Sequence, residues 1–401
     1  MKKPLRGVLG IGLGALLVGV TAGAGPRESA TATVDTGQVA ATIVNQTAGI
    51  RRGELVLIEG GTRDLKLLED LAVEVRKLGA HPLIVIGSDR LDRRMFMDVD
   101  KRFDSQEPKF AAQLAETIDA MITVDYMQKP DNLADIPMTR RAARAEVFEK
   151  IGATMRDRGV VQVHLGNDLY PTQALAEQFA IPYDKLAEIF WAGVNTNYDR
   201  LQVIGANVKD ALSKGKQLRI TAPNGTDLTV EIMGRPIFVS DGVVSSEDRY
   251  ERGPAAQVWL PAGEVYLTPV PKTAEGTFVA ETFFYEGNRV DGLTLKFKKG
   301  KLTSMTADSD ITALRAAYNA APSDRDWFGA IDIGINPDVK LPRGARVATW
   351  IASGTISMGI GSNTWAGGDN DVAYGLYAHL LKATLTVDNT KLVDTGRLLV
   401  Q

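Results

Sequence analysis

The stretch ELVLIEGG at residues 54–61, followed by DLKLLEDLAVEVRKLG at 64–79 and HPLIVIG at 81–87, decides the fold. The first and third segments are apolar runs with the length of buried strands. Between them, apolar side chains recur at helical spacing until Gly79, a typical helix stop. A strand, a helix and a strand in this order predict a parallel sheet covered by a helix.

The same alternation continues further along the chain. AMITVDY (120–126) and VVQVHLG (160–166) are typical of strands, and TRRAARAEVFEKIGATMRDRG (139–159) is typical of the helix between them. Three shorter helical segments close this part of the chain. We therefore expect an N-terminal domain over residues 37–215 that is built on a mainly parallel α/β sheet.

From about residue 216 the pattern becomes that of a β protein. Alternating apolar and polar residues in QLRITAP, TDLTVEI, GTFVAETFFYEG and LTLKFKKGKLTSMTA predict strands, which are joined by turns such as Asn224-Gly225. One helical segment, DITALRAAYNAA (310–321), interrupts them. We expect a β-rich C-terminal domain over residues 216–401 with a curved sheet or partial barrel. The fold class is therefore α/β plus α+β.

The N-terminus has the three parts of a signal peptide. MKKPLR supplies three positive charges, GVLGIGLGALLVGV is an uncharged run of 14 residues, and Ala22-Gly23-Ala24 offers small residues for cleavage. We expect a signal peptide at 1–24, a spacer at 25–36 and an exported protein, either periplasmic or extracellular. The alternative is an uncleaved N-terminal anchor, although no second apolar run follows.

The composition and charge of the chain exclude several classes of protein and partner. The chain is 44% hydrophobic and 24% charged, as is usual for a globular protein, and the absence of cysteine rules out disulfides and a lipoprotein anchor. Removal of residues 1–24 takes away three positive charges and no negative ones, which changes the formal net charge from −3 to −6. We therefore expect no nucleic-acid partner, and no membrane association after signal cleavage.

Common catalytic motifs are missing from the sequence. It has no P-loop, no GxSxG elbow and no HExxH helix, and GGTRDL at 60–65 lacks the further glycines of a dinucleotide loop. Three histidines occur. His81 is typical of a tight turn, His164 of a hydrogen-bonded residue in a sheet, and His379 of a packed apolar edge.

One acid stands out in the run LPAGEVYLTP at 260–269, namely Glu264. Burying a carboxylate without a partner costs several kcal/mol. We therefore expect Glu264 to meet a metal ion, a cation or hydrogen-bond donors, or else to face water.

At this point the sequence resembles a known family. LPAGEVYLTP, FGAIDIGINP, GTISMGIGSNTWAGG and KATLTVD, in this order, are similar to the C-terminal half of the aminopeptidase T family of metallo-aminopeptidases. RRGELVLIEG, YPTQALAEQFAIPYDKLAEIF and APNGTDLTVEIMGR match its N-terminal half. The resemblance implies a homodimer that releases N-terminal residues from peptides with two divalent ions, which would be cobalt, zinc or manganese.

The resemblance also implies five protein ligands for the two ions, of which Glu264 is retained. The other four positions fall on residues that are not the family's ligands: Ala330, Ser357, Gly375 and Tyr377. A tyrosine that assists the chemistry in the family falls on Thr364. Alanine, glycine and serine cannot supply the oxygen and imidazole donors of a dinuclear site.

Other residues nearby are candidates for a rebuilt metal site with Glu264. They are Asp332, Asp369, Asp371 and His379. Asp332 is two residues from Ala330 and would point the same way in a strand. The alternatives are a salt bridge for Asp332 and a solvated Gly-rich turn for the other two acids.

Two function classes follow. The first is an exported aminopeptidase T-like protein that uses a divalent metal at a degenerate site, with weak or absent activity. The second is a non-catalytic protein without a cofactor that binds a peptide or small molecule. Its cleft would be lined by Ala330, Ser357, Thr364, Trp365, Gly375 and Tyr377. The aromatic residues of this lining suit an organic ligand, or else form ordinary core. A more distant possibility is an iron-dependent ring-opening dioxygenase of the same superfamily.

Overall fold

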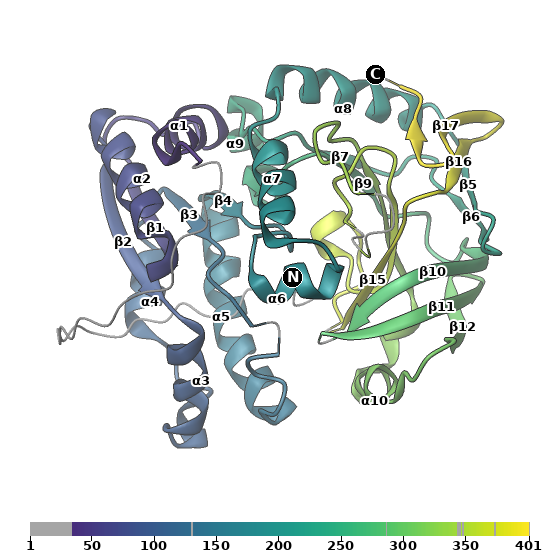
Figure 1. The fold of residues 1–401 in the computed structure, drawn as a ribbon, viewed down its shortest axis with the longest axis horizontal. Coiled ribbons are helices and arrows are strands. Elements are labelled where there is room, and N and C mark those ends of the chain that lie inside the picture. The colour runs from purple at the N-terminus through teal and green to yellow at the C-terminus, as the bar shows by residue number, and fades with distance from the viewer. Residues whose placement is uncertain are drawn as a thin grey trace.

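The computed structural model of the 401-residue chain describes residues 34–400, apart from 130, 286, 343–345, 347, 348 and 373. The expected signal peptide and most of the spacer lie outside the described residues. Figure 1 shows α1 to α5 with β1 to β4 on one side of the molecule and β5 to β7, β9 to β12 and β15 to β17 on the other. Among the described residues, no helix is long and apolar enough to cross a membrane.

The elements have the following bounds. The helices are α1 (Thr36–Thr42), α2 (Leu65–Lys77), α3 (Asp89–Met97), α4 (Lys109–Ala115), α5 (Met138–Arg158), α6 (Gln173–Phe179), α7 (Tyr183–Val194), α8 (Tyr198–Ser213), α9 (Ser246–Glu251) and α10 (Thr312–Ala320). The first strands are β1 (Leu55–Gly61), β2 (His81–Gly87), β3 (Ala120–Val124), β4 (Val161–Leu165), β5 (Gln217–Thr221), β6 (Asp227–Glu231), β7 (Ile237–Ser240), β8 (Gln257–Leu260) and β9 (Glu264–Leu267). The later strands are β10 (Glu275–Tyr285), β11 (Asn288–Lys298), β12 (Lys301–Thr306), β13 (Phe328–Gly334), β14 (Ile356–Gly361), β15 (Gly375–Leu380), β16 (Thr384–Val387), β17 (Thr390–Asp394) and β18 (Arg397–Leu398).

The first sheet, sheet A, is parallel and has the order β2-β1-β3-β4-β8. The predicted strand–helix–strand unit is confirmed as β1, α2 and β2. Leu68 and Leu71 of α2 belong to the same core as Ile58 on one face of the sheet. Alternate residues such as Leu57 pack on the other face, against α4 and α5.

Two antiparallel sheets form the β-rich part of the molecule. Sheet B has the order β12-β11-β10-β6-β5-β16-β17-β18, and sheet C has the order β15-β14-β13-β9-β7. Figure 1 places the β10–β12 ribbons at the outer side of this half, with α10 below them. The expected change from a parallel α/β sheet to β-rich structure is confirmed.

The run LPAGEVYLTP has the apolar character of a strand but is divided between two sheets. β8 ends at Leu260 in sheet A, whereas β9 begins at Glu264 in sheet C. Gly263, between them, has φ 131° and lies so close to Asn336 that a Cβ would stand 2.6 Å from the Asn336 Cβ. The chain therefore changes sheets here. The expected domain boundary at 215/216 stays a prediction, and β8 is a strand from beyond it that pairs with β4.

Two buried side-chain amides hold this connecting segment. The Asn167 Nδ2 group donates to the Pro261 carbonyl at 2.9 Å. The Asn336 Nδ2 group donates to the Ala262 carbonyl at 2.6 Å and to the Gly193 carbonyl at 3.1 Å. Buried carbonyls must find donors, and here side chains supply them in place of a neighbouring strand. Asn167 and Asn336 therefore fix the passage from sheet A to sheet C.

Replacement of Asn336 by alanine removes the donor from two carbonyls in a fully buried place. Because each buried group left unsatisfied costs about 1–3 kcal/mol, we expect Asn336→Ala to lower the free energy of unfolding by about 2–4 kcal/mol. Urea unfolding measures this change. Asn45→Ala is the control, since it removes an exposed amide that donates to the Ala41 carbonyl, and it should change stability by less than about 0.5 kcal/mol. Equal losses in the two variants would contradict the role given to Asn336.

Candidate functional site

One face of sheet C gathers most of the candidate residues. Four residues lie opposite one another in register, one from each of β9, β13, β14 and β15: Tyr266, Asp332, Ser357 and His379. Directly opposed residues share a face of a sheet. Glu264 lies two positions before Tyr266 in β9 and therefore points to the same side. Asp332 is its diagonal neighbour, at roughly 7–8 Å between Cα atoms.

Glu264 has a hydrogen-bond donor as its partner. Its side chain is only 2% exposed, and the Asn167 Nδ2 group donates to Oε1 at 2.9 Å. Asn167 follows β4 and has φ 46°, a left-handed conformation that asparagine tolerates better than most residues. Since a hydrogen bond to a charged group contributes about 1.5–3 kcal/mol, this contact stabilises the buried carboxylate substantially.

Ser357 and His379 form a polar pair at the β15 end of the row. Ser357 Oγ and His379 Nδ1 are 2.7 Å apart, and the His379 ring meets the Trp350 ring edge to face at 4.7 Å between centroids. Ser357 is 0% exposed, so a substrate carbonyl cannot reach its hydroxyl. Asp332 lies opposite Ser357 on the side away from His379. The arrangement therefore differs from a catalytic triad, in which the acid orients the histidine.

Aromatic rings fill the space beside Ala330. Ala330 is fully buried and packs in a cluster with Trp365, which is 7% exposed, and with Tyr266 and Tyr377. The Trp365 ring lies 5.2 Å from that of Tyr266 and 5.6 Å from that of Tyr377, and its Nε1 donates to the Tyr377 hydroxyl at 3.2 Å. The indole therefore occupies the place next to Ala330.

Glycine makes room for this packing in β14. The Tyr377 ring lies across Gly359, where a Cβ would stand 2.2 Å from Tyr377 Cε1. Gly375 lies opposite Gly361 at the exposed end of β15, so neither residue brings a side chain to the face. Thr364 is buried in the short 3₁₀ helix Thr364–Ala366.

Two of the acids proposed for a rebuilt metal site lie elsewhere. Asp369 and Asp371 are exposed in the loop between Ala366 and β15. In the part of the chain that the structure describes, no three aspartate, glutamate or histidine side chains are grouped so that they could hold a metal ion. The structure thus brings Glu264, Asp332 and His379 to one face but leaves the two loop acids in solvent. Their role as metal ligands stays a prediction.

Three residues at this face were not anticipated from the sequence, namely Asn167, Tyr266 and Trp350. Asn167 carried a weak signal, because it follows a strand of a parallel sheet, and the carboxyl ends of such strands are where functional side chains gather. Tyr266 and Trp350 carried none, since their ring contacts depend on strands that are distant in sequence.

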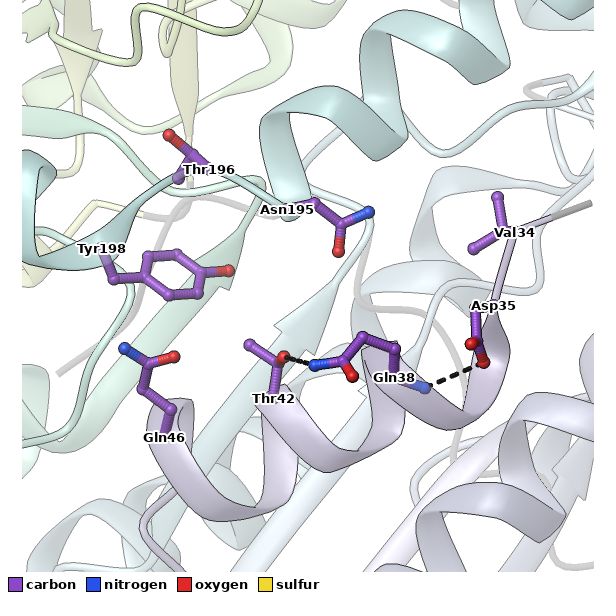
Figure 2. Close-up of a pocket in the computed structure, with 8 residues that line it drawn as sticks. All are labelled: Val34, Asp35, Gln38, Thr42, Gln46, Asn195, Thr196 and Tyr198. Atoms are coloured by element: carbon purple, nitrogen blue, oxygen red, sulfur yellow. Dashed lines mark hydrogen bonds between the residues drawn. The ribbon is translucent and has the colours of Figure 1, made fainter. Parts of the chain in front are cut away.

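Figure 2 shows a separate hollow of about 330 Å³ between α1 and the turn that joins α7 to α8. Its amide-bearing residues are Gln38, Gln46 and Asn195. Two hydroxyls in its wall are already engaged, because Thr196 donates to Asp338 Oδ2 at 2.7 Å and Tyr198 donates to the Val194 carbonyl at 2.6 Å. Asp35 accepts a hydrogen bond from the Gln38 backbone and caps α1. The hollow therefore offers amides and no cation or imidazole, and we assign it no chemistry.

A family model described as thermophilic metalloprotease (M29) matches residues 34–321. The chain belongs to this family. The resemblance to aminopeptidase T drawn from the sequence is thereby confirmed, and with it a peptidase-like class of function.

Two solved structures share the M29 chain's fold. Wild-type AmpT from Thermus thermophilus is 15% identical, with a TM-score of 0.70 over 91% of this chain and 99% of that one. The dihydroxypyridine dioxygenase from Pseudomonas putida KT2440 is 16% identical, with a TM-score of 0.59 over 91% of this chain and 97% of that one. At these identities the similarity establishes the fold alone. No curated protein sequence matches the chain.

Replacement of Asn167 by alanine removes the donor to both Glu264 Oε1 and the Pro261 carbonyl. We expect Asn167→Ala to destabilise the protein by about 2–3 kcal/mol. In a Glu264→Gln background the loss should be smaller by about 1 kcal/mol, because a neutral amide oxygen accepts a weaker bond than a carboxylate. Urea unfolding of the two single variants and the double variant measures this coupling. Strictly additive losses would show that the two side chains do not interact.

Proposed function

We propose that this M29 protein binds a peptide or another small organic molecule at the sheet C face and lacks the two-ion hydrolysis of metallo-aminopeptidases. The observation that carries the proposal is the packing of Ala330 against Trp365. The resemblance places a ligand glutamate at position 330. A methyl group against an indole takes up that place without providing a donor.

The residues at the face do not fit a pair of metal ions. Such a site needs several oxygen and imidazole donors that converge within a few ångströms. Glu264 already accepts a hydrogen bond from Asn167, and no group of three suitable side chains occurs among the described residues. We therefore derive no catalytic step through a metal.

The chemistry of the face supports an organic ligand. Tyr266, Tyr377 and His379 are only half-buried and bring ring surface to the outside of the row. In the same row, between Tyr266 and His379, lie the buried polar side chains of Asp332 and Ser357. Aromatic walls with a few fixed polar groups are typical of sites for small organic molecules. Peptides are the class that the family favours.

The second candidate is an aminopeptidase with weak activity at a reduced metal site. It is favoured by Glu264, a buried carboxylate in the place where the resemblance puts a metal ligand, with Asp332 as its diagonal neighbour. Cobalt, zinc or manganese would then be the metal. With either candidate we propose an exported homodimer, since residues 1–24 have the pattern of a signal peptide and the resemblance implies a dimer.

Metal content and turnover separate the two candidates. We expect the purified protein to contain less than about 0.1 equivalent of any transition metal by elemental analysis, since no three suitable side chains converge in the part of the chain that the structure describes. We also expect no hydrolysis of aminoacyl anilides when cobalt, zinc or manganese is added. Stoichiometric metal, together with turnover that Glu264→Ala abolishes, would defeat the binding proposal and establish the aminopeptidase.

Ligand binding is followed through tryptophan fluorescence with a panel of di- and tripeptides and free amino acids. We expect saturable quenching in the wild type and its loss in Trp365→Phe, because Trp365 lies behind the half-buried rings of Tyr266 and Tyr377. Trp259→Phe is the matched control, since Trp259 stacks on His164 in sheet A, at 4.2 Å between ring centroids. Equal quenching in both variants would exclude the surroundings of Trp365 as the site.

A further inference from the structure

The face of sheet A that packs against α4 and α5 becomes polar toward the carboxyl ends of its strands. Leu57 of β1 and Met121 of β3 lie side by side and belong to the apolar core under these helices. Two positions further along, the neighbours are Glu59 and Thr123. β1 and β3 flank the point where the strand order reverses, because β1 also pairs with β2 on its other side.

Glu59 faces a second buried acid, Asp92 of α3. Glu59 is 3% exposed and its Oε1 atom has no hydrogen-bond partner; Asp92 is 6% exposed and its Oδ1 atom also has none. The other Asp92 oxygen accepts a hydrogen bond from the Tyr126 hydroxyl at 3.1 Å. Two ionised carboxylates in such a place would repel each other and lack donors, and both conditions are costly.

A single proton removes both difficulties. On Glu59 it creates an O–H donor and leaves one negative charge, on Asp92. The half-buried guanidinium of Arg144 in α5, which lies over the Phe96 ring, balances that charge. Burial, and then the charge of Asp92, raise the pKa of Glu59 to about 8. Burial raises the pKa of Asp92 to about 6, so the pair holds one proton at neutral pH.

We propose that Glu59 and Asp92 form a proton-operated latch that fastens α3 to sheet A, closed while the pair shares one proton and released when both carboxylates are ionised. Tyr126 sets the geometry of the latch, because it packs directly against two glycines. A Cβ on Gly61 would stand 2.6 Å from the Tyr126 Cβ, and a Cβ on Gly87 would stand 2.5 Å from the ring carbon Cζ. The latch is independent of the function proposed for sheet C.

Other groups surround the pair on every element packed against it. They are Asp89 of α3, Tyr126 after β3, Arg144 of α5 and His164 of β4, which lies in the same row as Glu59 and Thr123. Asp89 lies in the same first turn of α3 as Asp92, and its Oδ2 accepts hydrogen bonds from the backbone of Gln128 and Lys129.

The sign of the pH effect follows from the direction of the shift. The folded state binds the Glu59 proton more tightly than the open state, in which the pKa returns toward 4.5. The closed state is therefore most favoured below pH 4.5, and this advantage is lost as the pH rises to about 8. For one such group the opening equilibrium constant should rise roughly tenfold between pH 7 and pH 9.

Trypsin cleavage reports the opening, since α3 contains Arg90, Arg93 and Arg94. Cleavage within α3 is measured from pH 7 to pH 9 and divided by the rate on an unstructured peptide at each pH. In the wild type we expect a roughly tenfold increase. In Glu59→Gln we expect none, because the amide is uncharged at every pH.

Asp241→Asn is the matched control. Burial raises the pKa of Asp241 to about 6, so its titration is complete below this range, and the variant should follow the wild type. If Glu59→Gln does not fold, Asp92→Asn replaces it and should make the increase smaller than in the wild type, since it removes the like charge but not the burial of Glu59. A tenfold increase in these variants as in the wild type, or no increase in the wild type, would overturn the latch.

Discussion

The passage of the chain from sheet A to sheet C depends on two side-chain amides. Between Leu260 and Glu264 the backbone leaves one set of strand neighbours and has not yet reached the next. Asn167 and Asn336 donate to the carbonyls of this segment from opposite halves of the molecule. They fix the first residue of β9, and therefore the register that brings Glu264, Tyr266 and their neighbours to one face of sheet C.

This arrangement gives Glu264 a structural role that requires no metal. A buried carboxylate needs donors, and Asn167 provides one from the loop after β4. The neighbouring positions have become a packed aromatic cluster around Ala330 and Trp365. An acid at a place where the resemblance implies a metal ligand is therefore weak evidence for a metal, because it can form one half of a contact between two parts of the fold.

Much of the architecture could be predicted from the sequence because it depends on local patterns of apolar and polar residues. The apolar runs at 54–61 and 81–87 and the helical period between them correspond to β1, β2 and α2. Sheet changes are different, since LPAGEVYLTP has the composition of one strand and only tertiary pairing divides it. The candidate site shows the same limit. The resemblance placed Glu264 and Ala330 at one site, but the Asn167 contact and the ring packing arise between residues that are distant in sequence.

The position of β8 in the sheet bears on how the molecule is assembled. Sheet A receives its last strand from the second half of the chain, after β5, β6 and β7 have been synthesised. Until then the outer edge of β4 presents unpaired backbone groups, and such edges invite pairing with other chains. Completion of the first sheet is thus a late, non-local step, and contacts of this kind slow folding. A polypeptide truncated before β8 would therefore expose the edge of β4, which is paired in the full-length protein, and would be prone to aggregate through it.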